Sequence, residues 1–251
     1  MVDDKLSYND QTMKAINKAR QKLGWILRTF RTRSVMFLRT LWNSLVQPHL
    51  DYCSVLWATA ASKTQRQNLE GPLRSMTRSA WGMRNTSYWD RLSKFKLYSN
   101  KRRMERYLCI YVWKSLHNVV PSLGLTWSKH ISNRTGHHLC VSTLQGPEGR
   151  AKTAMRKSVK YQGVIVFNSL PDHIKLWEGS LQGFKENLDS YLQMLPDNPE
   201  VGDLVPLART IWRKPSNSIV DWARYPDLWI ITDTVENHSL VYDNGMSMRD
   251  L

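Results

Sequence analysis

Hydrophobic residues in the N-terminal part of the chain recur at steps of three and four, which is the period of an amphipathic helix. The first such stripe lies between Asp10 and Arg33 and consists of Met13, Ile16, Leu23, Ile26, Leu27 and Phe30. Gly24 lies inside it, where glycine costs about 1 kcal/mol relative to alanine, and indicates a bend or a close helix contact. A second stripe predicts a helix that Pro48 interrupts or kinks; it consists of Val35, Leu38, Leu41, Trp42, Leu45 and Val46.

Capping signals mark the next predicted helices. Thr64 and Gln67 fit a capping box at the start of a third helix that continues through Leu69, Leu73, Met76 and Ala80. The pair Gly71-Pro72 inside this pattern puts the helix in doubt, because an interior proline costs about 3 kcal/mol. Ser87 is expected to cap a short helix, and Ser99 a longer one over about residues 100–118.

The second half of the chain is less regular. Residues 121–163 are rich in Gly, Ser, Thr, His and Lys, with short β-like pieces near 139–144 and a turn-forming run at 146–150. An amphipathic helix is expected between Leu181 and Leu195, ended by Pro196. The pattern therefore predicts a mainly α fold, a helical bundle followed by a less regular α-rich region with short β pieces.

Charge changes this picture of an ordinary helical protein. The chain has 251 residues and a formal net charge of +15. Residues 1–120 carry 22 basic and 7 acidic residues, whereas residues 121–251 carry 14 of each, so the whole excess lies in the first half. Such an excess is more than solubility requires and indicates a polyanionic partner.

Composition excludes several classes of protein. The hydrophobic content of 41% is too high for a disordered polycation. No apolar run reaches the roughly 20 residues of a membrane-spanning helix, and no secretory signal is visible. Cys53, Cys109 and Cys140 are odd in number and widely spaced, which argues against a disulfide framework. We expect an intracellular protein, nuclear or cytoplasmic, with no membrane partner and an undetermined oligomeric state.

Candidate catalytic and metal-binding groups are weak. Asp3-Asp4 resembles the metal-binding pair of polymerases, but only Met1-Val2 precedes it, so an exposed turn or frayed terminus is expected instead. His137, His138 and Cys140 have no second ligand pair at a matching spacing. We therefore assign no catalytic residue, no metal ligand and no cofactor to this chain.

Basic clusters make the stronger case for function. One lies at the junction of the first two helices and another at the start of the helix after Ser99. The residues expected to bind nucleic acid are Lys18, Lys22, Arg28, Arg31, Arg33, Lys101, Arg102, Arg103 and Arg106. Binding through them would be dependent on salt and independent of sequence. The alternative is a solvated basic face; the aromatic residues Trp42, Trp57 and Trp113 are expected in the core.

Five blocks in a fixed order resemble the region after the catalytic palm in reverse transcriptases of jockey-like non-LTR (LINE-type) retrotransposons. They are RQKLGWILRTFRTRS (20–34), LWNSLVQPHLDYCSVLW (41–57), SYWDRLSKFKLYSNKRRMERYLCIYVWKSL (87–116), VIVFNSLP (164–171) and FKENLDSYLQMLPDNP (184–199). The resemblance covers roughly residues 1–224, and the sequence after Arg224 matches nothing in the family.

This resemblance implies a division of the chain and a role for its first part. Residues 1–120 would form a basic helical thumb-like region, 121–163 a loop-rich basic linker, 164–200 the FNSLP element with an amphipathic helix, and 201–251 a poorly ordered acidic tail. In the family the thumb grips the template–primer duplex, an RNA–DNA hybrid or a DNA duplex. The catalytic Asp-Asp motif, which would use Mg²⁺, has no match here, so we expect no autonomous polymerase activity.

Three functions stay open at this point. The first is a non-catalytic nucleic-acid-binding fragment of a reverse transcriptase. The second is an RNA-directed DNA polymerase whose palm is missing from the gene model. The third is a host interaction protein that reuses a retroelement helical bundle.

Overall fold

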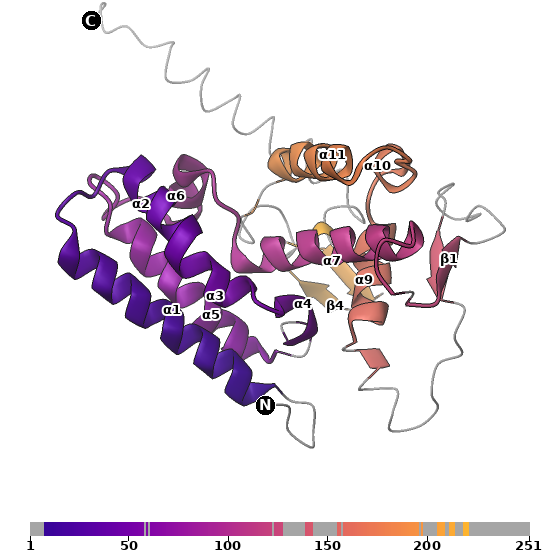
Figure 1. Cartoon of the computed structure of the whole chain (residues 1–251), viewed down its shortest axis with the longest axis horizontal. Helices are drawn as coiled ribbons and strands as arrows, with labels where there is room; N and C mark the ends of the chain where they lie inside the picture. The colour runs from indigo at the N-terminus through magenta and orange to yellow at the C-terminus, as the bar shows by residue number, and fades with distance from the viewer. Residues whose placement is uncertain are drawn as a thin grey trace, which may run out of the picture.

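A computed structural model of the protein describes residues 8–57, 59, 61–121, 123–127, 139–142, 155–156, 158–195, 197, 205–208, 211–213 and 218–220. Within these ranges the chain is mainly helical, which confirms the predicted fold class (Figure 1). The first helices are α1 (Asn9–Thr29), α2 (Val35–Leu41), the π-helix η1 (Trp42–Val46), α3 (Gln47–Asp51), α4 (Ser54–Trp57), α5 (Lys63–Arg78) and α6 (Tyr88–Phe95). They are followed by α7 (Asn100–Leu116), α9 (Val159–Asn168), α10 (Asp172–Lys175) and α11 (Leu181–Met194).

Helix α1 is uninterrupted at Gly24, and a Cβ placed there would meet nothing within 4 Å. The bend or close contact predicted from this glycine is therefore wrong. The helix ends at Thr29, four residues before the predicted end, because the Arg33 side chain turns back and donates to the carbonyl oxygens of Leu27 and Phe30. These are carbonyls that the last turn of a helix leaves without an intrahelical donor.

Pro48 is accommodated by a change of helical period. The chain passes from α2 into the π-helix η1, where the Gln47 amide donates to the carbonyl oxygen of Trp42, five residues back. Pro48 then lies in the first turn of α3, directly after the π-helix. The predicted interruption is thus a π-type insertion within a continuous helical segment.

The capping box of helix α5 lies two residues before the predicted one. Ser62 accepts a hydrogen bond from the Gln65 amide, and the Gln65 side chain accepts one from the Ser62 amide, so Ser62 and Gln65 form the box rather than Thr64 and Gln67. The helix continues through Pro72 to Arg78. The doubt that Gly71-Pro72 raised about this helix is therefore removed.

The two predicted serine caps are confirmed. Ser87 accepts a hydrogen bond from the Asp90 amide at the start of α6, and Ser99 accepts one from the Arg102 amide at the start of α7. Asp197 fixes Ser99 further, because its carboxylate accepts hydrogen bonds from the Ser99 amide at 2.6 Å and from the hydroxyl at 2.8 Å. The start of α7 is thus tied to the chain beyond α11.

Two hydrophobic cores divide the described residues. The first lies among α1, η1, α5 and α6 and includes Trp42 and Trp57, each 1% exposed. The second lies among α7, α9 and α11 and includes Trp113, 3% exposed. All three tryptophans are in the core, as predicted. The cores separate between Leu97 and Leu108, whereas the predicted division lies at residue 120. Helix α7 belongs mainly to the second core.

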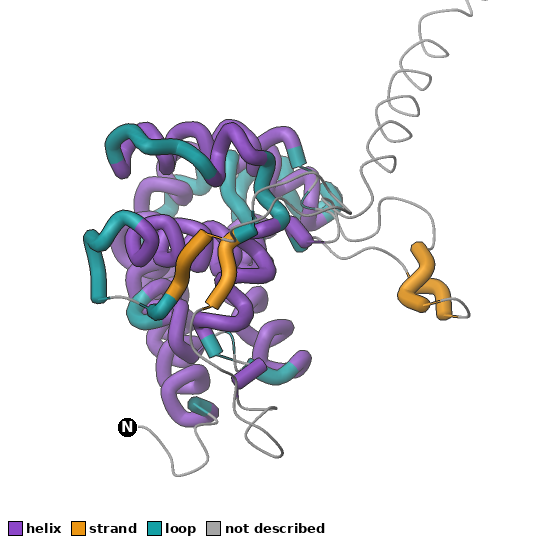
Figure 2. The backbone as a smooth tube through the Cα atoms, turned by 90° about the vertical axis from the view of Figure 1, so that its right-hand side faces the viewer, coloured by secondary structure: helices purple, strands orange, loops and turns teal. Residues whose placement is uncertain are grey.

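Short antiparallel strands complete the fold. Strand β1 (Leu125–Trp127) pairs with β2 (Cys140–Ser142), and β3 (Val205–Ala208) pairs with β4 (Ile211–Arg213) (Figure 2). Strand β2 lies where short β pieces are predicted, whereas β1 lies outside that range. The FNSLP element positions β2, because the Asn168 amide group bonds both the amide and the carbonyl of Cys140, at 2.8 and 2.9 Å. The prediction for residues 146–150 lies outside the described residues, as do most of the 121–163 linker and of the 201–251 tail.

The three cysteines differ in their exposure. Cys53 is exposed, Cys109 and Cys140 are buried, and all three are free. Burial raises the pKa of the Cys140 thiol to about 11.

In the part of the chain that the structure describes, no helix is long and apolar enough to cross a membrane.

Candidate nucleic-acid interface

The outer face of α1 carries a stripe of cations. Lys14, Lys18 and Lys22 follow one another at four-residue steps, and Arg28 lies in the same sector, which covers about 120° of the helix circumference. All four side chains are exposed. Buried Ile16, Ala19 and Leu23 occupy the opposite sector. The stripe is therefore held in place by the packing of the other side of the same helix.

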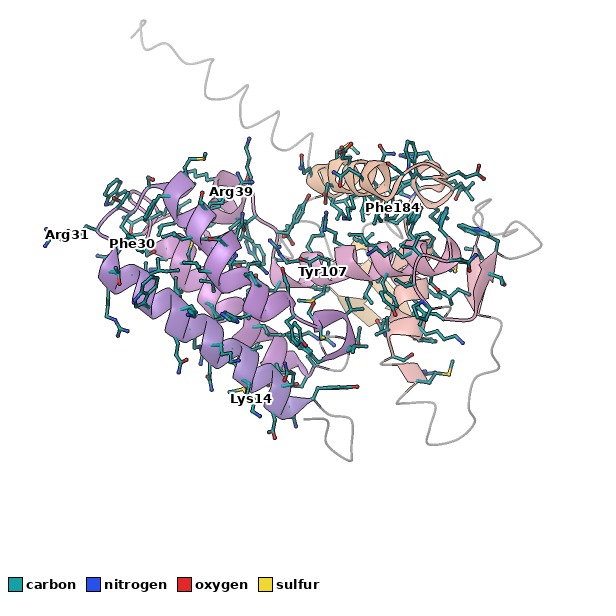
Figure 3. All side chains as sticks on the ribbon, viewed as in Figure 1. Lys14, Phe30, Arg31, Arg39, Tyr107 and Phe184 are labelled. Carbon is teal, nitrogen blue, oxygen red and sulfur yellow. The ribbon has the colours of Figure 1, made fainter. Side chains whose placement is uncertain are left out.

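Acidic residues are scarce around the stripe, and α1 itself contains one, Asp10 in its first turn. Residues 11–50 contain eight Lys and Arg residues and no Asp or Glu. From Lys14 to Arg28 the stripe extends for about 21 Å at 1.5 Å per residue, a length that corresponds to about six base pairs at 3.4 Å each. Figure 3 shows Lys14 and Arg31 projecting outward near the two ends of α1.

An aromatic side chain lies within the stripe. Trp25 is 47% exposed and lies between the directions of Lys18 and Arg28 on the helical wheel. Its ring makes an edge-on contact with Phe30, with the centroids 5.9 Å apart, and Phe30 in turn contacts Phe37 of α2. Trp25 is thus anchored on one edge while nearly half of its surface is open. An exposed indole beside cations has the chemistry to stack on an unpaired base.

The two predicted loop residues differ in their environments. Arg31 is exposed in the loop between α1 and α2. Arg33 is half-buried, and its guanidinium is engaged with the α1 carbonyls described above. Arg31 is available to a ligand, whereas Arg33 mainly ends the helix.

Arg102 is a correction to the predicted site. Its side chain has no exposed surface, and its Nη1 donates to the carbonyl oxygens of Leu192 and Leu195, each at 3.3 Å. These carbonyls belong to the end of α11, so Arg102 joins α7 to the C-terminal end of that helix. A phosphate cannot reach this guanidinium, and the assignment of Arg102 to nucleic-acid binding is wrong.

Arg103 and Arg106 are partly exposed but paired with carboxylates. Arg106 donates two hydrogen bonds to Asp189, with Nη2 2.7 Å from Oδ2, and this hydrogen bond raises the pKa of the arginine. Arg103 lies 3.5 Å from the Asp51 carboxylate, which also accepts a hydrogen bond from Tyr107. Lys101, the remaining predicted cation of α7, is half-buried and lies near Glu105, whose pKa its charge lowers.

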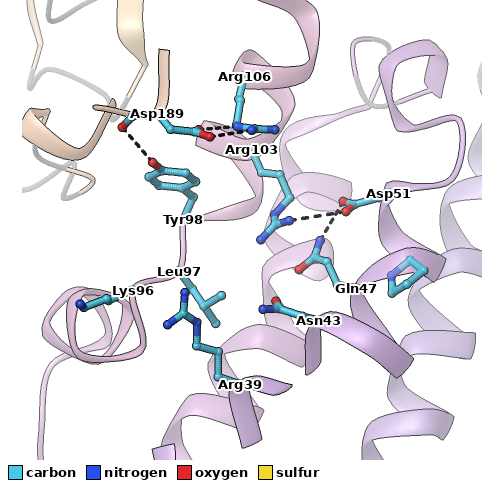
Figure 4. A pocket seen from close by; sticks show the side chains of 11 residues that line it. Arg39, Asn43, Gln47, Asp51, Lys96, Leu97, Tyr98, Arg103, Arg106 and Asp189 are labelled. Atoms are coloured by element: carbon cyan, nitrogen blue, oxygen red, sulfur yellow. Dashed lines mark hydrogen bonds and ion pairs between the residues drawn. The ribbon is translucent and has the colours of Figure 1, made fainter. Parts of the chain in front are cut away.

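These pairs line a pocket of about 320 Å³ between the two cores (Figure 4). Arg39 of α2 and Lys96, which ends α6, face it from the side of the first core, and Asp189 faces it from α11. Tyr98 also bridges the cores by donating to the Asp189 carbonyl oxygen at 3.3 Å. The Arg103–Asp51 and Arg106–Asp189 pairs join α7 to α3 and to α11 across this pocket, so they help to hold the two halves of the chain together.

A second, strongly basic pocket was missed by the sequence analysis. It lies between α5 and α6, has a volume of about 630 Å³, and is lined by Arg74, Ser75, Arg78, Ser79, Arg84 and Arg91. None of the described residues that line it is acidic. The four-residue spacing of Arg74 and Arg78 on a helix is visible in the sequence. The convergence of Arg84 and Arg91 on them depends on the turn between the helices.

Metal-binding geometry is not found among the described residues, where no three His, Cys, Asp or Glu side chains are grouped as ligands. Cys140 is buried against α9. His137 and His138 lie outside the described residues, and so does Asp3-Asp4.

Comparison with known proteins gives one relative. No family model and no solved structure matches the chain. The chain is similar to an uncharacterized protein of Caenorhabditis elegans, B0403.1, with 32% identity over 123 residues. The matched region covers 47% of this chain and 59% of that protein, so the chain spans less than two thirds of the relative's length.

Proposed function

We propose that the chain is a non-catalytic nucleic-acid-binding fragment of a retrotransposon-derived reverse transcriptase. It would grip an RNA–DNA hybrid or a DNA duplex, in the nucleus or cytoplasm, through the basic face of its first helical bundle. The observation that carries the proposal is the α1 stripe of Lys14, Lys18, Lys22 and Arg28, which is exposed and is followed by no acidic residue before Asp51. Each phosphate neutralised by such a cation releases condensed counterions, which drives binding without sequence preference.

The distribution of cations favours α1 over α7 as the binding face. On α7, Arg102 is buried and Arg106 is paired with Asp189, so these charges serve the fold. On α1, Ile16, Ala19 and Leu23 pack into the core, whereas the four cations on the opposite side of the helix are exposed. We therefore propose Lys14, Lys18, Lys22, Arg28 and Arg31 as the phosphate-contacting residues.

The two alternatives to this function are a polymerase and a host interaction protein. A polymerase would require a palm with its Asp-Asp motif, and genomic sequence that encodes this motif in frame with the chain would favour that function. A host interaction protein would be favoured if the intact chain unfolds cooperatively and is expressed from a stable transcript but binds no nucleic acid.

The test is a salt titration of binding by fluorescence anisotropy, with a labelled RNA–DNA hybrid and a labelled DNA duplex of about 20 base pairs. If the five proposed cations each contact a phosphate, log K should fall with log salt with a slope of about −4.5. Lys18→Gln combined with Lys22→Gln should reduce affinity for both probes and lower the magnitude of the slope by about 2. Absence of salt-dependent binding at low ionic strength would reject the proposal.

A matched control separates the stripe from charge in general. Lys114→Gln with Lys185→Gln removes the same charge from α7 and α11, on the second core. This variant should keep most of the affinity and the full slope. Equal losses in the two double variants would show that binding follows net charge rather than the α1 face.

A further inference from the structure

The basic pocket between α5 and α6 has the features of a built anion site. Arg91 is only 7% exposed, and it is fixed by hydrogen bonds from Nε to Thr77 Oγ1 at 3.2 Å and from Nη1 to the Thr86 carbonyl oxygen at 2.5 Å. Burial lowers the pKa of Arg91, and so do the nearby charges of Arg78 and Arg74. The fold thus holds these positive charges close together where water is partly excluded. A bound anion would relieve the repulsion between them.

Two aromatic rings lie against Arg74 at the edge of the pocket, although neither is among the residues that line it. The Arg74 guanidinium lies 4.1 Å from the centroid of the Tyr88 ring and 5.7 Å from that of Trp89. Tyr88 is itself held from behind, because its hydroxyl donates to the buried Glu70 carboxylate. Arg74 is therefore positioned by ring contacts, and its N–H groups remain available for a ligand. Trp89 is half-buried and offers part of its ring beside the pocket.

A second feature extends this basic pocket toward α1. Gly71, Arg74 and Arg78 lie on one face of α5, at steps of three and four residues. Arg20 of α1 lies over the same face, because a Cβ placed at Gly71 would be 3.7 Å from Arg20 Nη2. A line of guanidinium groups thus leads from α1 into the pocket.

We propose that this pocket binds the phosphate monoester of a nucleotide, with Arg78, Arg84 and Arg91 on the phosphate and Arg74 with Trp89 beside the base. Guanidinium groups bind phosphate oxygens through paired, charge-assisted hydrogen bonds. A monoester carries up to two negative charges, which suits four arginines better than the single charge of an internal diester. An aromatic ring next to the phosphate site suits a nucleotide, because every base can stack on it.

The phosphate could come from the end of a nucleic-acid strand or from a free nucleotide. The strand-end source rests on the function proposed above, whereas the free nucleotide does not depend on it. Both share the same chemistry, so the pocket and the α1 stripe can be tested separately.

The experiment compares single-stranded oligonucleotides of about 12 residues with a 5′-phosphate or a 5′-hydroxyl, and in a second arm measures binding of AMP and of adenosine by calorimetry. Binding should be about 10-fold tighter for the phosphorylated member of at least one pair, as expected for charge-assisted hydrogen bonds. Discrimination between oligonucleotides identifies the strand end as the source, and discrimination only between AMP and adenosine identifies the free nucleotide.

Arg78→Gln with Arg84→Gln should abolish this discrimination. These two exposed arginines are chosen because replacing the buried Arg91 would endanger folding. Lys94→Gln removes an exposed charge from α6 outside the pocket and should leave the discrimination intact. The proposal is overturned if the wild type does not distinguish phosphate from hydroxyl in either pair, or if the double variant still does. A phosphoserine peptide that binds as tightly as AMP would overturn the nucleotide assignment.

A failure of the nucleotide-pocket proposal can be distinguished from a failure of the proposed duplex binding. The α1 stripe variants should weaken binding equally for probes with a phosphate end and probes with a hydroxyl end. The pocket variants should change only the ratio of the affinities for the phosphate-ended and hydroxyl-ended probes.

Discussion

Gly163 of α9 approaches α7 so closely that a Cβ at this position would lie 2.8 Å from Cγ2 of Val112. Gly163 thus permits the close packing of the two helices that build most of the second core. Gly163→Ala should lower the free energy of unfolding by up to about 2 kcal/mol, because overpacking costs about 1–3 kcal/mol and alanine in a helix returns roughly 1. Urea unfolding followed by circular dichroism measures this, and a raised midpoint would contradict the close approach.

Gly24 provides the opposite case within α1. A Cβ there meets nothing within 4 Å, so alanine adds helix propensity without a clash. Gly24→Ala should raise the free energy of unfolding by about 1 kcal/mol and the melting temperature by roughly 2–4 °C. A thermal melt beside that of Gly163→Ala tests the contrast; a lower melting temperature would mean that this part of α1 needs the glycine.

Arg102 and Lys22 should respond differently to the loss of their charge. Arg102→Gln should cost about 3 kcal/mol of unfolding free energy, because a buried charged donor to two carbonyls is lost. Lys22→Gln should leave stability within about 0.5 kcal/mol but reduce the magnitude of the salt slope of duplex binding by about 1. Unfolding curves and anisotropy titrations on both variants check this; a stable Arg102→Gln variant with weakened binding would reverse our correction.

Glu105 should make stability depend on pH. Burial raises the pKa of this carboxyl above its ordinary value of 4.5, although Lys101 and the hydrogen bonds from Ser218 and Ile219 oppose the shift. Since the folded state holds the proton more tightly than the unfolded state, Glu105 costs stability as pH rises from about 4.5 through its folded pKa.

Glu105→Gln removes that titration and can keep both hydrogen-bond partners. The unfolding free energy of the variant relative to the wild type should therefore increase as the pH is raised from about 4.5 toward neutrality. Denaturant titrations at several pH values measure the difference, in which the other titrating groups cancel. A difference that does not vary with pH would show that Glu105 titrates alike in both states.

Local signals explain what could be predicted from the sequence. Ser87 and Ser99 cap helices through amides three residues away, so their roles are visible in a short window. Core positions such as Trp42 and Trp113 follow from helical periodicity. The Ser62 box was missed because Thr64 and Gln67 present the same residue types at the same spacing, two positions along.

Partners distant in sequence explain what could not be predicted. Arg102 and Arg106 look like free cations beside Arg103, but their acceptors lie on α11, some 83–93 residues away. The basic pocket needs the turn that brings Arg84 and Arg91 against α5. Charge counting finds the basic half of the chain, whereas only tertiary packing decides which of its cations remain open to a ligand.

The hydrogen bonds of Glu105 with Ser218 and Ile219 carry a consequence for synthesis on the ribosome. The Ser218 pairing spans 113 residues, whereas the first core contains only residues between Ala15 and Leu97. The first bundle can thus form while translation continues, since domains fold in the order in which they emerge. The α7 segment must wait for Leu192 and Leu195, the acceptors of Arg102, and then for Ser218, the donor to Glu105. A ribosome stalled before residue 218 would hold a formed first bundle beside an unfinished second core, which chaperones would recognise.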